Sequence, residues 1–188
     1  MGTLEVGSGE IAGIKCCGGC GPFEEDDLGF KAPSGDRHYY LELVGDERKD
    51  RLVALYDRDN PGVEEDTVIH RIAEMAIYLH AVVNMPRTNG VSLPPSSAVD
   101  EHWHNAILDT TRYPDLCNAL GATSGIINHL PSIVTKYDRV NAAQPVRGTT
   151  RDTFALLRVA EYPVDRKLWI PNTPGNVGLV EASNCCGH

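Results

Sequence analysis

The stretch VDEHWHNAILD, residues 99–109, carries the side chains best suited to chemistry, because two histidines flank a tryptophan between two aspartates. Imidazole and carboxylate groups bind metals and act as general acids or bases. On a helix, Asp100 and His104 are four residues apart and share one face. His102 and Asp109 lie elsewhere around the cylinder. The stretch therefore supplies one pair, in which the carboxylate either orients the imidazole or shares a metal with it.

Two long helices are predicted to position this pair. The segment 64–85 has apolar residues at three- and four-residue spacing, and His80 lies within its apolar stripe. The segment 97–120 begins at Ser97, a suitable N-cap. Pro114 suits the first turn of a second helical piece within that segment. Neighbouring antiparallel helices would bring their inward side chains to one point in a bundle core.

A metal site is the first hypothesis. Its candidate ligands are three histidines and one aspartate: His80, Asp100, His104 and His129. Three imidazole nitrogens and a carboxylate suit zinc or iron, and an open position on the metal would activate a bound water. Asp109 or Tyr113 would then assist as acid or base. The open alternative is structural: the aspartate caps a helix, and the histidines are core residues with ordinary hydrogen bonds.

The same stretch resembles a known family, the plant and bacterial glycine-rich domain-containing protein-like family. The matching motif is Asp-x-x-Trp-His-x-His-x-Leu-Asp-Thr, with a Tyr, a Cys and a His-x-Pro downstream. It falls on Asp100, Trp103, His104, Leu108, Asp109, Thr110, Tyr113, Cys117, His129 and Pro131. The resemblance is dense over residues 94–131 and follows 64–170 in outline. One position departs from the family, because its second histidine falls on Ala106. The resemblance informs the fold more than the function.

Cysteines near the two ends of the chain form the second hypothesis. Cys17-x-x-Cys20 has the spacing of a zinc knuckle, and Cys185-x-x-His188 has the same spacing. Together they would form a Cys₃His zinc clip. Disulfides among these cysteines, or a redox or copper site, remain alternatives. Cys117 lies on an apolar helix side and is expected to be buried.

Composition narrows the class of protein. A chain of 188 residues with 41% hydrophobic and 23% charged residues suits one globular domain. The net charge of −9 disfavours nucleic acid as a partner. No segment has the run of about 20 apolar residues that a membrane helix needs. Without a recognisable secretory signal, the expected compartment is the cytoplasm. The partner classes left open are a second copy, as a homo-oligomer, and another protein.

The fold class that follows is mainly α, a single-domain helical bundle with a small β element and long irregular termini. An irregular Cys/Gly-rich segment covers 1–36, the helical domain 37–170, and an irregular Cys-containing tail 171–188. The β element is RHYYLELV, residues 37–44, whose alternating polarity and aromatic side chains suit a strand. The function that follows is metal binding, with catalysis as one use of the site. The alternative is a non-enzymatic interaction or assembly protein whose terminal cysteines are structural.

Overall fold

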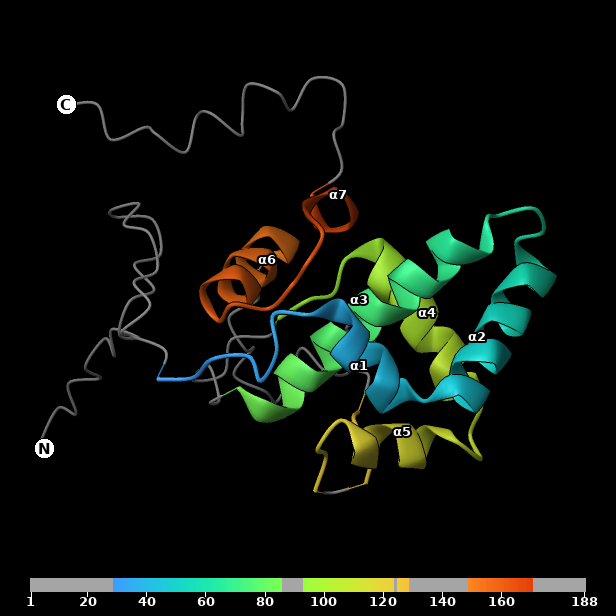
Figure 1. The fold of residues 1–188 in the computed structure, drawn as a ribbon, viewed down its shortest axis with the longest axis horizontal. Helices are drawn as coiled ribbons and strands as arrows, with labels where there is room; N and C mark the ends of the chain where they lie inside the picture. The colour runs from blue at the N-terminus through green and yellow to red at the C-terminus, as the bar shows by residue number, and fades with distance from the viewer. Residues whose placement is uncertain (1–28, 86–92, 124, 129–148, 171–188) are drawn as a thin grey trace, which may run out of the picture.

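The computed structural model describes residues 29–85, 93–123, 125–128 and 149–170. This part of the chain is mainly helical, as predicted, with 66% of it in helices. The helices are α1 (Arg37–Val44), α2 (Asp46–Asp59), α3 (Glu65–Asn84), α4 (Ser97–Leu108), α5 (Tyr113–Ala119), α6 (Thr150–Val159) and α7 (Arg166–Trp169). Figure 1 shows α3 running through the middle of the bundle, with the other helices around it. The predicted domain boundary at residue 36 lies within the described residues, directly before α1, and the one at residue 171 lies outside them.

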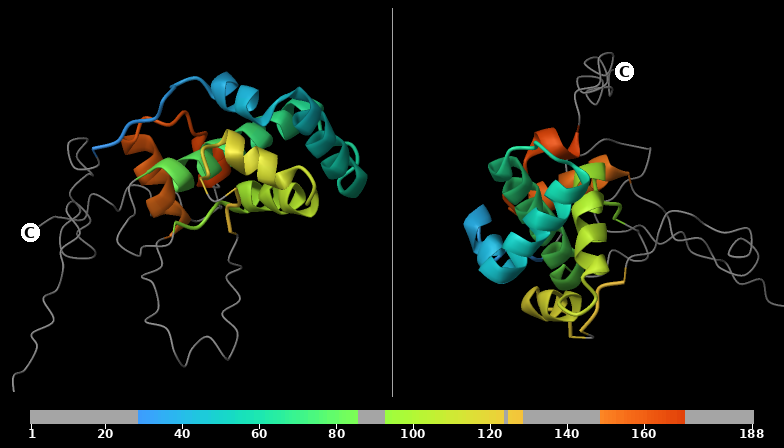
Figure 2. Two further views of the ribbon diagram at one scale, coloured as in Figure 1. Left: turned by 90° about the horizontal axis from the view of Figure 1, so that it is seen from below. Right: turned by 90° about the vertical axis from the view of Figure 1, so that its right-hand side faces the viewer.

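The central position of α3 follows from its composition. Every residue from Ile72 to Ala81 is buried, so this stretch has no solvent-facing side. A helix that is apolar all round must be enclosed by neighbouring elements. The most extensive contacts of α3 are with α1 and α4, and the two views in Figure 2 show helices covering it from several sides. The helix predicted at 64–85 is therefore confirmed as the core element.

The predicted small β element is wrong, because residues 37–44 form α1 and the described residues contain no strand. Asp36 caps this helix, its carboxylate accepting a hydrogen bond from the His38 N–H at 2.9 Å. Tyr40 and Val44, four residues apart, are both fully buried. Eight residues with mixed aromatic and polar side chains satisfy both the strand and the helix period, and tertiary burial selects the helix.

The segment predicted at 97–120 forms two helices, α4 and α5, as expected. The N-cap of α4 is Ser96 and not the predicted Ser97, and the Ser96 hydroxyl accepts from the Val99 N–H at 3.3 Å. Pro114 lies in the first turn of α5. Gly121 follows α5 with φ of 98°, a conformation that favours glycine at a helix end. The first residue of α4 and the end of α5 thus lie close to the positions that the sequence predicts.

A buried carboxylate joins the beginning and the end of the described domain. Glu74 of α3 is fully buried, and one of its oxygens, Oε1, accepts from Arg37 Nη2 and from the Asp165 N–H, both at 2.9 Å. Its other oxygen accepts from Trp169 Nε1 at 2.8 Å. These bonds attach α1 and the short α7 to the same point of the central helix. No helix among the described residues is long and apolar enough to span a bilayer.

Candidate functional site

The predicted pair Asp100–His104 is formed, and it lies on the solvent-facing side of α4. His104 Nδ1 donates to the Asp100 carbonyl oxygen at 2.8 Å and is 3.5 Å from the Asp100 carboxylate. The neutral imidazole therefore carries its lone pair on Nε2, the other ring nitrogen. Because the carboxylate lies on the Nδ1 side, it orients the ring rather than sharing a metal bound at Nε2. About half of the His104 side chain is exposed, 51%.

His80 lies apart from this pair. It is buried and packs against the rings of Tyr40 and Tyr162, and its Nδ1 is 2.9 Å from the Tyr162 hydroxyl. Tyr78, two residues earlier, packs against Trp103 of α4. Two residues on a helix point about 200° apart, so His80 faces away from α4. Burial lowers the pKa of His80, which keeps this imidazole neutral at pH 7.

The predicted acid/base residues hold the α4–α5 connection in place. The Asp109 carboxylate forms an ion pair with Arg51 of α2. The Tyr113 hydroxyl accepts from Trp103 Nε1 at 2.8 Å and donates to the Ile127 carbonyl oxygen at 2.5 Å. Burial raises the pKa of Tyr113 well above its usual range, so its hydroxyl keeps its proton at neutral pH.

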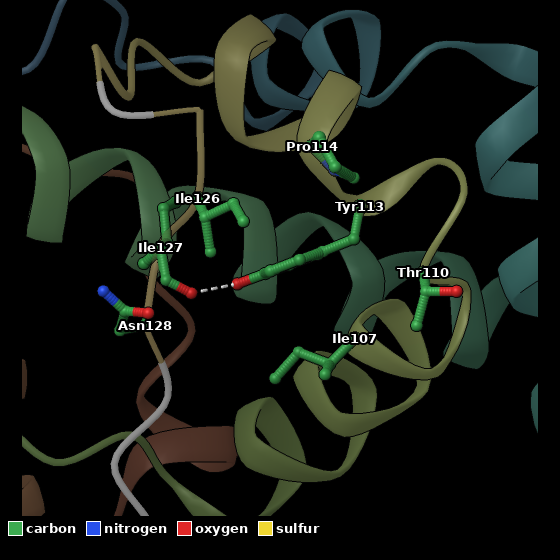
Figure 3. A pocket seen from close by; sticks show the side chains of 7 residues that line it. All are labelled: Ile107, Thr110, Tyr113, Pro114, Ile126, Ile127 and Asn128. Atoms are coloured by element: carbon green, nitrogen blue, oxygen red, sulfur yellow. Dashed lines mark hydrogen bonds between the residues drawn. The ribbon is translucent and has the colours of Figure 1, made fainter.

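A pocket opens between the end of α4, the start of α5 and the chain after it. Its volume is about 280 Å³, and its lining is mainly apolar: Ile107, Thr110, Tyr113, Pro114, Ile126, Ile127 and Asn128. Figure 3 shows the Tyr113 ring reaching across the pocket, with its hydroxyl bonded to the Ile127 carbonyl. Ile126 is 49% exposed, and Leu108 of α4 is 72% exposed. The pocket thus offers apolar surface without an ionisable group among these lining residues other than that tyrosine.

The remaining predicted ligands lie outside the described residues: Cys17, Cys20, His129, Cys185 and His188. Within the described ranges, no group of three or more His, Cys, Asp or Glu side chains is placed to hold a metal ion. Cys117 is buried, as expected, and its sulfur accepts from the Ile127 N–H at 3.3 Å. A zinc or iron site that recruits the other residues stays a prediction.

The other histidine of residues 99–109, His102, is buried and was not among the predicted ligands. It is 1% exposed, its Nδ1 donates to the Ala98 carbonyl at 2.9 Å, and its ring stacks on Tyr56 of α2. Its Nε2 has no hydrogen-bond partner in the described part of the chain. The signal was available, because Val99, His102 and Ala106 follow the three- and four-residue spacing of a buried helix face.

Comparison with known proteins adds no relative. No known protein family, curated protein or solved structure matches this chain. The resemblance carried by residues 94–131, including the departure at Ala106, stays a prediction from those motif residues.

Proposed function

We propose that this chain is a non-enzymatic interaction module whose pocket between α4 and α5 receives an apolar side chain of a partner protein. The observation that carries the proposal is the lining of the pocket, which is mostly isoleucine, proline and the face of a tyrosine ring. The one ionisable lining group, Tyr113, is already engaged in two hydrogen bonds that support the fold. Such a site favours burial of an apolar group over chemistry on it.

The size and surroundings of the pocket favour a protein partner. A volume of about 280 Å³ suits one or two apolar side chains. The exposed side chains of Leu108 and Ile126 extend the apolar surface beyond the pocket itself. The chain carries a net charge of −9, so basic residues beside the apolar anchor of the partner would strengthen association.

A peptide selection tests this proposal directly. A random peptide library displayed on phage is panned against the full chain, and the selected peptides are measured by fluorescence polarisation. We expect peptides with a Leu, Ile or aromatic anchor flanked by Lys or Arg. The Ile126→Asp variant places a charge in the pocket wall, and we expect it to weaken binding about tenfold or more.

Val82→Asp is the matched control, because Val82 is also a partly exposed apolar residue, at 39%, and does not line the pocket. Binding should be unchanged in this variant. A library that yields no binder, or binders equally weakened by both substitutions, would contradict the proposal. Self-association that is lost in Ile126→Asp would assign the pocket to a second copy and overturn the proposal of a different partner.

Metal binding at His104 is the second candidate, and the orientation of its ring favours it. The bond from Nδ1 to the helix carbonyl directs the lone pair to Nε2, and the Asp100 carboxylate supports that orientation. Metal-binding histidines commonly have this arrangement, with a carbonyl or carboxylate on the other nitrogen. Further ligands would come from the predicted residues outside the described ranges, such as His129.

Metal analysis of anaerobically purified full-length protein tests this second candidate. We expect one zinc or iron per chain, lost in His104→Ala. His38→Ala is the matched control, because His38 also lies 3.5 Å from a carboxylate four residues away, that of Glu42. Loss of metal in Cys20→Ser instead would support the terminal zinc clip. Protein without metal under these conditions would refute both sites.

A further inference from the structure

Helix α4 has a solvent-facing surface that leads into the α4–α5 pocket. Asp100, His104 and Ile107 follow one another at four- and three-residue spacing, so they lie in one row along the helix. Ile107, at the end of this row, lines the pocket. Glu101 and Leu108 lie beside the row, and both are exposed. The solvent-facing surface of α4, defined by these five residues, is therefore continuous with the pocket.

Charge is distributed unevenly along the solvent-facing surface of α4. Its first half carries two carboxylates, that of Asp100, which is 38% exposed, and that of Glu101. Its second half is apolar and consists of Ile107 and Leu108. Asp100 and Ile107 are seven positions apart, as are Glu101 and Leu108, which corresponds to about 10 Å along a helix. A partner that covers this surface therefore meets an apolar half and an acidic half two helical turns apart.

Acidic residues close to the apolar half are already paired with guanidinium groups. The Asp109 carboxylate, directly after Leu108, is 9% exposed and forms an ion pair with Arg51. Arg112, in the α4–α5 connection, forms an ion pair with Glu47. A basic residue of a partner gains little beside these pairs, because their charges already compensate each other. Charge complementarity thus places a basic residue at the acidic half of α4.

A helical partner suits this surface better than an extended one. An extended peptide satisfies its backbone N–H and C=O groups by joining the edge of a sheet, and the described residues contain no strand. A helix satisfies these groups internally and presents side chains at i, i+3, i+4 and i+7 on one face. Two turns of such a helix match the distance between the apolar and the acidic half of α4.

The helix dipoles favour one direction for this partner. The acidic half of the surface begins in the first turn of α4, at the positive end of its dipole. An antiparallel partner helix places its own C-terminal end there, which is the negative end of its dipole and the end where Lys and Arg are most favourable. The basic residue of the partner therefore follows its apolar anchor in the sequence.

We propose that the partner is an amphipathic helix lying antiparallel on α4, with a Leu, Ile or aromatic anchor in the pocket and a Lys or Arg seven positions later, beside Asp100 and Glu101. This inference rests on the proposed function, because it takes the pocket as the site of the apolar anchor. It adds the secondary structure of the partner, its direction and the position of its charge.

Peptides selected on the full chain test this inference through their sequences, their binding and their circular dichroism. We expect a Lys or Arg seven positions after the anchor, and a rise in helical signal when a peptide binds. Glu101→Lys turns an attraction into a repulsion, so we expect it to weaken binding about fivefold or more at low salt. A peptide whose basic residue is replaced by Glu should bind Glu101→Lys more tightly than it binds the wild type.

Glu42→Lys is the matched control, because Glu42 is a glutamate of α1 that is 67% exposed, and the variant has the same net charge as Glu101→Lys. Binding should change less than about twofold in this control. Thermal unfolding checks that both variants are folded.

The outcomes separate this inference from the proposed function. Peptides that lose binding in Ile126→Asp but are insensitive to Glu101→Lys would overturn the inference and leave the pocket as the binding site. The same holds for pocket-dependent peptides that bind without gaining helix, or whose basic residue precedes the anchor. A library without pocket-dependent binders would overturn both.

Discussion

The buried Glu74 carboxylate allows the sharpest test of how this fold is held together. Glu74→Gln keeps the size of the side chain and removes its charge. If the amide oxygen takes the place of Oε1, it still accepts from Arg37 and Asp165. The amide nitrogen then faces Trp169 Nε1, and two donors meet without an acceptor. The Trp169 N–H, in a residue only 2% exposed, is left unsatisfied.

The size of the effect follows from the burial of the groups. Breaking a buried ion pair costs about 3–5 kcal/mol. Arg37 keeps 31% of its side chain exposed and recovers part of its hydration, so the expected loss of unfolding free energy is about 3 kcal/mol. For a domain of this size the midpoint of thermal unfolding should fall by roughly 10–15 °C. Circular dichroism during heating and urea unfolding measures both quantities.

Two further variants test whether the effect is specific to the hydrogen bonds of Glu74. Glu42→Gln changes an exposed glutamate of α1, 67% exposed, and we expect less than about 0.5 kcal/mol. Trp169→Phe removes the indole donor, so Glu74→Gln should cost less in that background than in the wild type. A Glu74→Gln protein as stable as Glu42→Gln, or a cost that is the same in both backgrounds, would refute the role assigned to these hydrogen bonds.

Three other predictions concern stability. Burial lowers the pKa values of His80 and His102, so the unfolding free energy measured in urea should fall from pH 7.5 to pH 5.5. An equal or higher unfolding free energy at pH 5.5 would contradict the lowered pKa values. Glu161 has a φ of 63°, a conformation that favours glycine, so Glu161→Gly should raise the unfolding free energy by about 0.5 kcal/mol in the same assay. A lower unfolding free energy in this variant would show that the backbone is not strained there. Gly121→Ala should lower the unfolding free energy by about 2 kcal/mol, because the φ of residue 121 is positive and the new Cβ would lie 3.0 Å from Asn84 Oδ1. An unchanged unfolding free energy would mean that this turn adapts to the new side chain.

The sequence predicted the elements whose signal is local and long. The 20 residues of α3 repeat the apolar spacing over several turns, and Pro114 and Gly121 mark the ends of α5. The eight residues of α1 are too few to separate a helical from an extended period. Its helix depends on burial of Tyr40 and Val44 in the core, which no local pattern records.

The candidate site was predictable to the same extent. The pairing of Asp100 with His104 follows from a four-residue spacing, and the structure confirms that contact. Which histidine of α4 faces the core depends instead on Tyr56, 46 positions before His102, whose ring covers it. The hydrogen bond between His80 and Tyr162 spans 82 positions. Contacts of this range are set by the packing of helices, so residue spacing alone could not separate His80 from the pair.

The position of Glu74 in the sequence also affects how the chain folds while it is being synthesised. Its partners lie 37 positions before it and 91 and 95 positions after it. A nascent chain that has released α1, α2 and α3 holds the carboxylate with Arg37 alone, and burying it in that state is unfavourable. The core around α3 therefore becomes stable only after residues 165–169 leave the ribosome. A chain truncated before residue 165 would lack the Asp165 and Trp169 donors to this buried carboxylate, so we expect it to be less stable than the full chain.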